Sequence, residues 1–390
     1  MKAYKTTVGI LAVLNVAALV AAGTYAYAHD SFGTRLRQVA VLPLPSRLVL
    51  EYVESLVRDS KPAPTEAARE YAYVASIYSD TEQKSGTAQA ILASRRIAEL
   101  LFPEDKLAIA TATESVYRAL GIKPAVELTG DSQKVLDTYV DRMKQDGDQL
   151  AWDGVVPVGQ GKWVAPAGKK PFTPRAGDWK RWLVSGDFSV PAPPAYGSAA
   201  DQAQIAIVRE AVAKRTAADV DLINFWGGTP GTNTPSGIWQ DQLYRNTDTA
   251  QLGFDLLKRD KSYAQIQKVL AQTLADSFME CWKAKYTYWT ARPDMRIPGL
   301  KTAMPDPVFP GYVSGHSMVS KAAAQVLSIM VPQHADDWQR MALDARYSRL
   351  VAGIHFESDN QAGFSLGEQV GNQIVSTQGL QAVIGGSDTQ

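Results

Sequence analysis

Two of the chain's four histidines lie in sequence surroundings that suggest chemistry. His29 lies beside a predicted cleavage point and His334 lies in a polar turn, so we expect both at the surface. His316 follows a Ser-Gly pair, and His355 precedes Asp359 by four residues. Imidazole titrates near neutral pH and can serve as an acid, a base, a nucleophile or a metal ligand. His316 and His355 are therefore the starting points for a candidate site.

A pair of cations precedes the two histidines. Lys285 and Arg292 are seven residues apart, which is almost two turns of a helix, so a helix would project both from one face. Pro293 cannot continue that helix and would leave Arg292 at its end. Two aligned like charges repel unless they share an anion. A solvated basic face is the alternative interpretation of this pair.

The second motif is a turn rich in glycine and proline that opens into a predicted helix. Ser314 offers a hydroxyl donor, Gly315 allows close approach of the backbone, and the helix start supplies free N–H groups. His316 at this position could act as a general acid or base. The alternative is a capped helix start that carries an incidental histidine. The motif is not a nucleophile elbow, because its G-x-S-x-G pattern is absent.

The third motif joins His355 to Asp359. On a helix, residues four apart face each other, and a carboxylate bonded to one imidazole nitrogen fixes the tautomer and raises the basicity of the other. Arg349 would lie about 120° away on the same helix. Its long side chain, or a break at Gly353, would be needed to bring it to the same place. A divalent-metal site at His355 and Asp359 is the alternative.

Together the three motifs predict a site for a tetrahedral oxyanion, phosphate or vanadate, within residues 285–359. The planar guanidinium groups of Arg292 and Arg349 match the oxygens of such an anion, and Lys285 adds a third positive charge. His355 would be the central ligand or nucleophile.

The elements that must position these residues are predicted to be almost entirely α-helical. Apolar residues recur at intervals of three and four, and alternating strand-like runs are scarce. The pattern predicts helices over residues 48–58, 66–78, 88–101, 106–120, 132–144, 201–214, 217–226, 250–258, 263–288, 317–330, 335–352 and 360–376.

Residues 151–200 differ from the rest of the chain. Prolines and glycines crowd this stretch and forbid a long helix, yet its tryptophans are too apolar for a disordered linker. We expect an ordered loop excursion, either functional or a structural crossover. It separates an N-terminal helical region, residues 29–150, from a C-terminal catalytic region, residues 201–380, and residues 381–390 are expected to form a flexible tail.

The N-terminus resembles an export signal. Lys2 and Lys5 precede an apolar run from Val8 to Ala22 and an A-x-A site ending at Ala28. Residues 1–28 are therefore expected to be a signal peptide, giving a periplasmic or secreted protein without an integral membrane span after cleavage; an uncleaved anchor is the alternative. Net charge is zero and no basic block occurs, so no nucleic-acid partner is expected. The single cysteine, Cys281, excludes an intramolecular disulfide.

In order and spacing, these motifs resemble the superfamily that joins type 2 phosphatidic-acid phosphatases, bacterial class A acid phosphatases and vanadium haloperoxidases. Its pattern is K-x6-R-P, then P-S-G-H, then S-R-x5-H-x3-D. The chain departs from it once, because Val313 replaces the usual proline before Ser314. The resemblance implies an all-α helical bundle, and looser similarity over residues 45–380 favours the exported bacterial haloperoxidase-like branch.

The resemblance also implies roles. Lys285, Arg292 and Arg349 would clamp the oxyanion, and Ser314 with the amide of Gly315 would complete the cradle. His316 would handle the leaving-group or peroxide proton.

In the same resemblance, Asp359 would orient His355. His355 would be the axial ligand of vanadium in a haloperoxidase, which uses hydrogen peroxide to oxidise halide. It would be the phosphorylated nucleophile in an acid phosphatase, which hydrolyses a phosphomonoester without a cofactor. The first function is favoured and the second is the alternative. A non-catalytic anion-binding relative is a third hypothesis.

Overall fold

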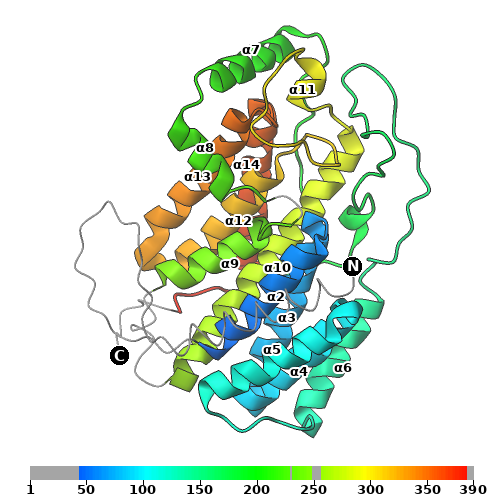
Figure 1. Cartoon of the computed structure of the whole chain (residues 1–390). Helices are drawn as coiled ribbons and strands as arrows, with labels where there is room; N and C mark the ends of the chain where they lie inside the picture. The colour runs from blue at the N-terminus through cyan, green and yellow to red at the C-terminus, as the bar shows by residue number, and fades with distance from the viewer. Residues whose placement is uncertain (1–43, 229–230, 248–255, 384–390) are drawn as a thin grey trace. The chain divides into compact units, whose positions relative to one another are not determined.

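In a computed structural model of the protein, which describes residues 44–228, 231–247 and 256–383, α-helices dominate (Figure 1). This part of the chain contains no β-strand, only one isolated bridge between Lys162 and Thr290. The prediction of an all-α fold with a long loop excursion is confirmed. The predicted signal peptide and the end of the predicted tail lie outside the described residues.

The described residues divide into two compact units. The first comprises residues 44–56, 73–140 and 256–265, and the second comprises residues 57–72, 141–228, 231–247 and 266–383. The helices of the N-terminal half are α2 (Pro45–Ser60), α3 (Pro64–Ser85), α4 (Thr87–Leu101), α5 (Lys106–Leu120) and α6 (Gly130–Lys144). Those that follow are α7 (Ala199–Ala213), α8 (Ala217–Phe225), α9 (Thr234–Asn246), α10 (Leu256–Tyr288), α11 (Pro293–Arg296), α12 (Gly315–Met330), α13 (Ala335–Ala352) and α14 (Glu357–Thr377).

Helix α12 forms the centre of the second unit, and α13 and α14 pack against it (Figure 1). It is apolar or small on nearly all sides, as expected for a helix covered by neighbours. Three glycines of α14, spaced by four residues, face α12. A Cβ atom would lie 2.5 Å from the Ser314 carbonyl oxygen at Gly363 and 2.2 Å from the Met318 carbonyl oxygen at Gly367. The two helices can therefore approach more closely than larger residues would allow.

The Pro- and Trp-rich excursion is ordered and packs on α10. Trp163 is fully buried, and the carboxylate of Asp276 on α10 accepts the backbone N–H groups of residues 182–184 at 2.7, 2.7 and 3.0 Å. Burial raises the pKa of Asp276 to about 6, although these three bonds favour the charged form. The buried carboxylate of Asp276 thus accepts backbone N–H groups that a helix or sheet would otherwise satisfy, and it holds this segment in place.

Two helix predictions were wrong. Helix α9 was not predicted; its Pro235 lies in the first turn, where helices tolerate proline, and Ile238, Trp239 and Leu243 are buried. The predicted break between residues 258 and 263 does not exist, because α10 runs unbroken from Leu256 to Tyr288. None of the described helices combines the length and apolar character needed to cross a bilayer.

Candidate functional site

The end of α10 brings the first two cations together, although not as helical spacing predicts. The helix ends at Tyr288, and Trp289 has a φ of 54°, which stops it. Arg292 therefore lies in extended backbone as the N-cap residue of α11, and the expectation that one helix carries both cations was wrong. Lys285 and Arg292 nevertheless lie near the same aromatic ring, 5.2 and 5.1 Å from the centroid of Phe309.

Both cations are fully buried and contact the loop before α12. The ammonium group of Lys285 donates to the carbonyl oxygens of Pro310 and Gly311 at 2.8 and 2.7 Å. Arg292 donates through Nε to the Phe309 carbonyl at 3.2 Å and through Nη1 to the Ile354 carbonyl at 2.8 Å. Its Nη2 atom is buried and has no partner among the described residues. An unsatisfied buried guanidinium nitrogen is costly unless a ligand accepts from it.

The start of α12 lies where the sequence places it. Gly315 is its first residue, so the N–H groups of the first turn have no helical carbonyl partner. The Ser314 N–H donates to the Asp359 carbonyl at 2.9 Å, which ties this turn to α14. Val313, in place of the usual proline, is buried and follows a cis peptide bond.

Arg349 reaches the site because α13 ends at Gly353, whose φ of 76° breaks the helix as expected. The guanidinium is fully buried and donates from Nε to Ser348 Oγ at 2.9 Å. Nη1 and Nη2 lie 3.4 Å from the carbonyl oxygens of Gly227 and Ile223, at the C-terminal end of α8. Burial, followed by the charge of Arg292, lowers the pKa of Arg349 to about 9.

His355 and Asp359 form a contact, but the two residues do not share a helix. His355 lies before α14, which begins at Glu357, and Asp359 lies in the first turn of that helix. Asp359 Oδ2 accepts the Phe356 N–H at 3.1 Å and lies 3.1 Å from His355 Nδ1. The neighbour of the other ring nitrogen, Arg292 Nη1, can only donate, so the proton of the neutral imidazole lies on Nδ1 and faces Asp359.

The other nitrogen of His355 is therefore an acceptor. Nε2 lies 3.4 Å from Arg292 Nη1, which can only donate. Burial, and then the charges of Arg292 and Lys285, holds the pKa of His355 well below its usual value. The imidazole is neutral, and its Nε2 lone pair faces Arg292 Nη1 across a long contact of 3.4 Å, which a ligand would replace.

His316 has the opposite tautomer. Its Nε2 lies 2.8 Å from the Trp226 carbonyl oxygen, which can only accept, so Nε2 carries the proton and Nδ1 has the lone pair. Burial, and then Arg349, holds the pKa of His316 well below its usual value. In this state His316 can accept a proton at Nδ1 but cannot act as a cationic acid.

The site concentrates positive charge without a matching carboxylate. In the described part of the chain, no ion pair involves Lys285, Arg292 or Arg349. Burial lowers the pKa of Lys285 to about 7, and burial raises the pKa of Asp306 to about 8, so Asp306 is largely neutral at pH 7. Burial also raises the pKa of Asp359. An anion bound among these groups would favour their charged forms.

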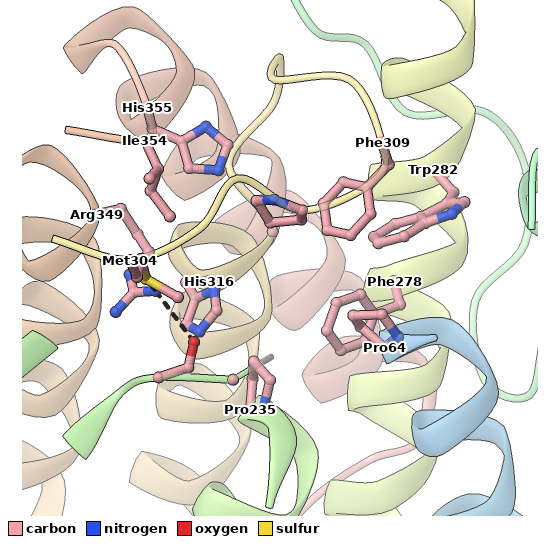
Figure 2. Close-up of a pocket in the computed structure, with 14 residues that line it drawn as sticks. Pro64, Pro235, Phe278, Trp282, Met304, Phe309, His316, Arg349, Ile354 and His355 are labelled. Atoms are coloured by element: carbon pink, nitrogen blue, oxygen red, sulfur yellow. Dashed lines mark hydrogen bonds between the residues drawn. The ribbon is translucent and has the colours of Figure 1, made fainter. Parts of the chain in front are cut away.

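A cavity of about 30 Å³ lies among these residues (Figure 2). Its wall includes both histidines, Arg349, and the glycines 227 and 228 that follow α8. A Cβ atom at Gly228 would lie 2.5 Å from His316 Nε2. A second cavity, of about 250 Å³, reaches Asp359 and is walled by the excursion, α7 and α11. Asp359 therefore lies beside both the oxyanion site and a larger space.

The structure brings together every residue that the sequence analysis assigned to the site. It also adds residues that the sequence did not reveal, chiefly the carbonyls of Ile223, Trp226 and Gly227. Backbone carbonyls leave no trace in residue type, so no sequence signal could have found them. In the described residues no three His, Cys, Asp or Glu side chains cluster, so a divalent metal at His355 and Asp359 would find no third ligand of these types there.

Comparisons with known proteins concern the fold. The family described as the VCPO second helical-bundle domain matches residues 330–382, which include α13 and α14. A crystal structure of a bacterial vanadium-dependent iodoperoxidase has a TM-score of 0.72, with 19% sequence identity, and the match covers 87% of this chain and 98% of that one. No curated protein sequence matches the chain.

Two crystal structures of bacterial vanadium-dependent chloroperoxidase are also similar. The apo form has a TM-score of 0.63 at 13% identity and covers 81% of this chain and 94% of that one. The holo form has a TM-score of 0.61 at 12% identity and covers 86% and 93%. These matches confirm the predicted resemblance: the chain has the fold of the vanadium haloperoxidase superfamily.

Proposed function

We propose that the protein is a vanadate-dependent haloperoxidase, which oxidises halide with hydrogen peroxide. The observation that carries this proposal is the unprotonated Nε2 of His355, 3.4 Å from Arg292 Nη1, beside three buried basic side chains that form no ion pair among the described residues. A neutral imidazole lone pair next to uncompensated positive charge suits an anionic, ligand-accepting centre. The solved structures with this fold include proteins described as vanadium-dependent iodoperoxidase and chloroperoxidase, which supports the same assignment.

The donor set fits vanadate. His355 Nε2 would be its protein ligand, and Lys285, Arg292 and Arg349 would neutralise its oxygens together with Ser314 and the first-turn amides of α12. The unpartnered Nη2 of Arg292 is the donor that most needs such an oxygen. Vanadate, when bound, supplies a centre that readily becomes five-coordinate and activates hydrogen peroxide toward halide.

The protein's own residues would then hold charge and move one proton. Asp359 keeps the proton of His355 on Nδ1, so that Nε2 stays available. His316 would accept the proton of the incoming peroxide at Nδ1, because its Nε2–H is committed to the Trp226 carbonyl. A phosphomonoesterase would instead need a protonated histidine to release its alcohol.

The test compares the purified protein with and without added orthovanadate. We expect peroxide-dependent oxidation of iodide or bromide only with vanadate, and no hydrolysis of p-nitrophenyl phosphate beyond background. His355→Ala should abolish the oxidation. His334→Ala, a matched change at a histidine outside the site, should keep it.

Hydrolysis of the phosphate ester without any halide oxidation, at any vanadate concentration, would assign the site to a phosphomonoesterase. Binding of phosphate and vanadate without either activity would assign it to a non-catalytic anion-binding relative. Full activity in His355→Ala would overturn the site itself.

A further inference from the structure

We propose that Ser317 and Asn360 are positioning residues that decide where the hydroxyl proton of Ser314 points. Ser317 Oγ lies 3.1 Å from Ser314 Oγ and 3.1 Å from Asn360 Oδ1, and it can donate to either. All three side chains are fully buried. The inference rests on the proposed oxyanion site, because Ser314 is one of the donors of its cradle.

A serine hydroxyl has one proton, so Ser317 serves only one of its two acceptors at a time. If Ser317 donates to Asn360, its oxygen is left to accept, and the Ser314 proton points toward Ser317. If Ser317 donates to Ser314, the Ser314 proton is free for an oxyanion. An arrangement with no proton between Ser314 Oγ and Ser317 Oγ would set their lone pairs against each other at 3.1 Å, so the two favourable hydrogen-bond directions are an inward and an outward state of the same three residues.

Neighbouring groups fix the heavy atoms of Ser314 and Asn360, so only the hydroxyl protons can change position. Asn360 Nδ2 lies 3.4 Å from a carboxylate oxygen of Glu357, which can only accept, so the carbonyl side of the amide faces Ser317. The backbone of Ser314 is held by its N–H bond to the Asp359 carbonyl and by the close approach of Gly363 to its own carbonyl. The heavy atoms cannot move far, and the change of state is a rotation of hydroxyl groups.

An oxyanion selects the outward state, because it is a stronger acceptor than the neutral oxygen of Ser317. Asn360 Oδ1 draws the Ser317 proton toward itself and so favours the inward state, whereas the anion favours the outward state. The acceptor strength at position 360 should therefore set the oxyanion affinity, although Asn360 makes no contact with the anion in this scheme.

Two substitutions at position 360 should act in opposite directions. Asn360→Asp strengthens the competing acceptor and should weaken binding of inorganic phosphate and orthovanadate by about tenfold, the upper range for one hydrogen bond. Asn360→Leu removes the acceptor and should tighten binding by about threefold. Isothermal titration of the full chain measures both. A structural role alone would weaken binding in both variants.

The control repeats both substitutions in Ser317→Ala, which lacks the hydroxyl proton that Ser314 Oγ and Asn360 Oδ1 share. Against it, Asn360→Asp should keep only its charge effect, so it should weaken binding less than in the native background, and Asn360→Leu should have no effect. Thermal unfolding identifies any variant that fails to fold, and Asn360→Ala then replaces Asn360→Leu.

The inference would be overturned if the position 360 substitutions weakened anion binding equally in the native protein and in Ser317→Ala. It would also be overturned if Asn360→Asp and Asn360→Leu changed the affinity in the same direction. Either result would leave the proposed oxyanion site standing. Failure of the unmodified protein to bind either anion would overturn the proposed function, and this inference with it.

Discussion

The two buried histidines of the site are held in opposite ways. His355 is fixed through Nδ1 by a side-chain carboxylate four residues away, whereas His316 is fixed through Nε2 by the backbone carbonyl of Trp226, ninety residues earlier in the chain. The carboxylate of Asp359 can itself titrate, but a carbonyl cannot. The comparison shows how one fold gives two imidazoles different duties, a ligand at Nε2 and a base at Nδ1.

We call His355 with Asp359 the carboxylate half of the site, and His316 with the Trp226 carbonyl the carbonyl half. The largest expected difference between these two halves is in the binding of the oxyanion. His355→Ala should abolish both halide oxidation and vanadate affinity, because it removes the proposed ligand. His316→Ala should lower turnover by about 100-fold to 10,000-fold, the usual range for a general base, and change phosphate affinity by less than about threefold. Steady-state kinetics and phosphate titration measure the two effects.

Equal loss of affinity in both variants would break the comparison, because it would make His316 a ligand as well. The control is His334→Ala, which changes neither half of the site.

The carboxylate half can be weakened separately. Asp359→Asn keeps an oxygen that can face His355 Nδ1 and the Phe356 N–H, as Oδ2 does in the unmodified protein, but removes the charge that steadies His355. We expect turnover to fall by about 10-fold to 100-fold, as for other partners of metal-binding histidines. Asp336→Asn, an exposed change at the start of α13, is the control and should keep full activity.

The contact between His316 and the Trp226 carbonyl involves a backbone atom, so a substitution can weaken it only by displacing the backbone. Gly228→Ala places a Cβ 2.5 Å from His316 Nε2 at a φ of 63°, so it should displace the segment that carries the Trp226 carbonyl. We expect a loss of turnover of about tenfold and a stability loss of about 1–3 kcal/mol. In Gly311→Ala the nearest atoms lie at 3.4 Å, an ordinary contact, so this matched change beside Asp359 should cost much less.

Unchanged kinetics in Gly228→Ala would show that the Trp226 carbonyl does not hold His316. Kinetics and urea unfolding of both glycine variants provide the measurement.

The same contrast explains what the sequence could predict. Most of the helices and the site residues follow from residue types and spacing, and Gly353 breaks α13 as expected. The helical geometry that was expected to bring the site residues together was partly wrong. Arg292 lies in extended backbone and His355 lies in a bend, both beside helix ends, because Trp289 and Phe356 adopt conformations that helical arithmetic does not include.

Other contacts had no sequence signal at all. The carbonyl of Trp226 could be any residue's carbonyl, so its pairing with His316 depends on the packing of α8 near the start of α12. Ser317 and Asn360 flank predicted site residues, yet their contact joins two helices 43 residues apart in sequence. Side-chain motifs are visible in a sequence, whereas backbone acceptors and contacts between helices require the fold.

The smallest predicted effect is a difference in the pH dependence of stability. The folded pKa of His316 lies below the unfolded value of about 6.5, so the unfolded chain takes up a proton that the folded chain refuses, and stability falls as pH drops below 6.5. His355 behaves alike, but the pKa of Asp359 is raised, so this carboxyl binds a proton on folding and opposes the effect over the same range.

His316→Gln should therefore lower the slope of unfolding free energy against pH by about 1.4 kcal/mol per unit between pH 5 and 6.5. His355→Gln combined with Asp359→Asn should leave that slope nearly unchanged, because two opposite linkages are removed together. Urea unfolding in phosphate-free buffer measures both slopes. If His316→Gln keeps the original slope, His316 takes up its proton in the folded state, and a neutral base fixed by the Trp226 carbonyl is the wrong description of that half of the site.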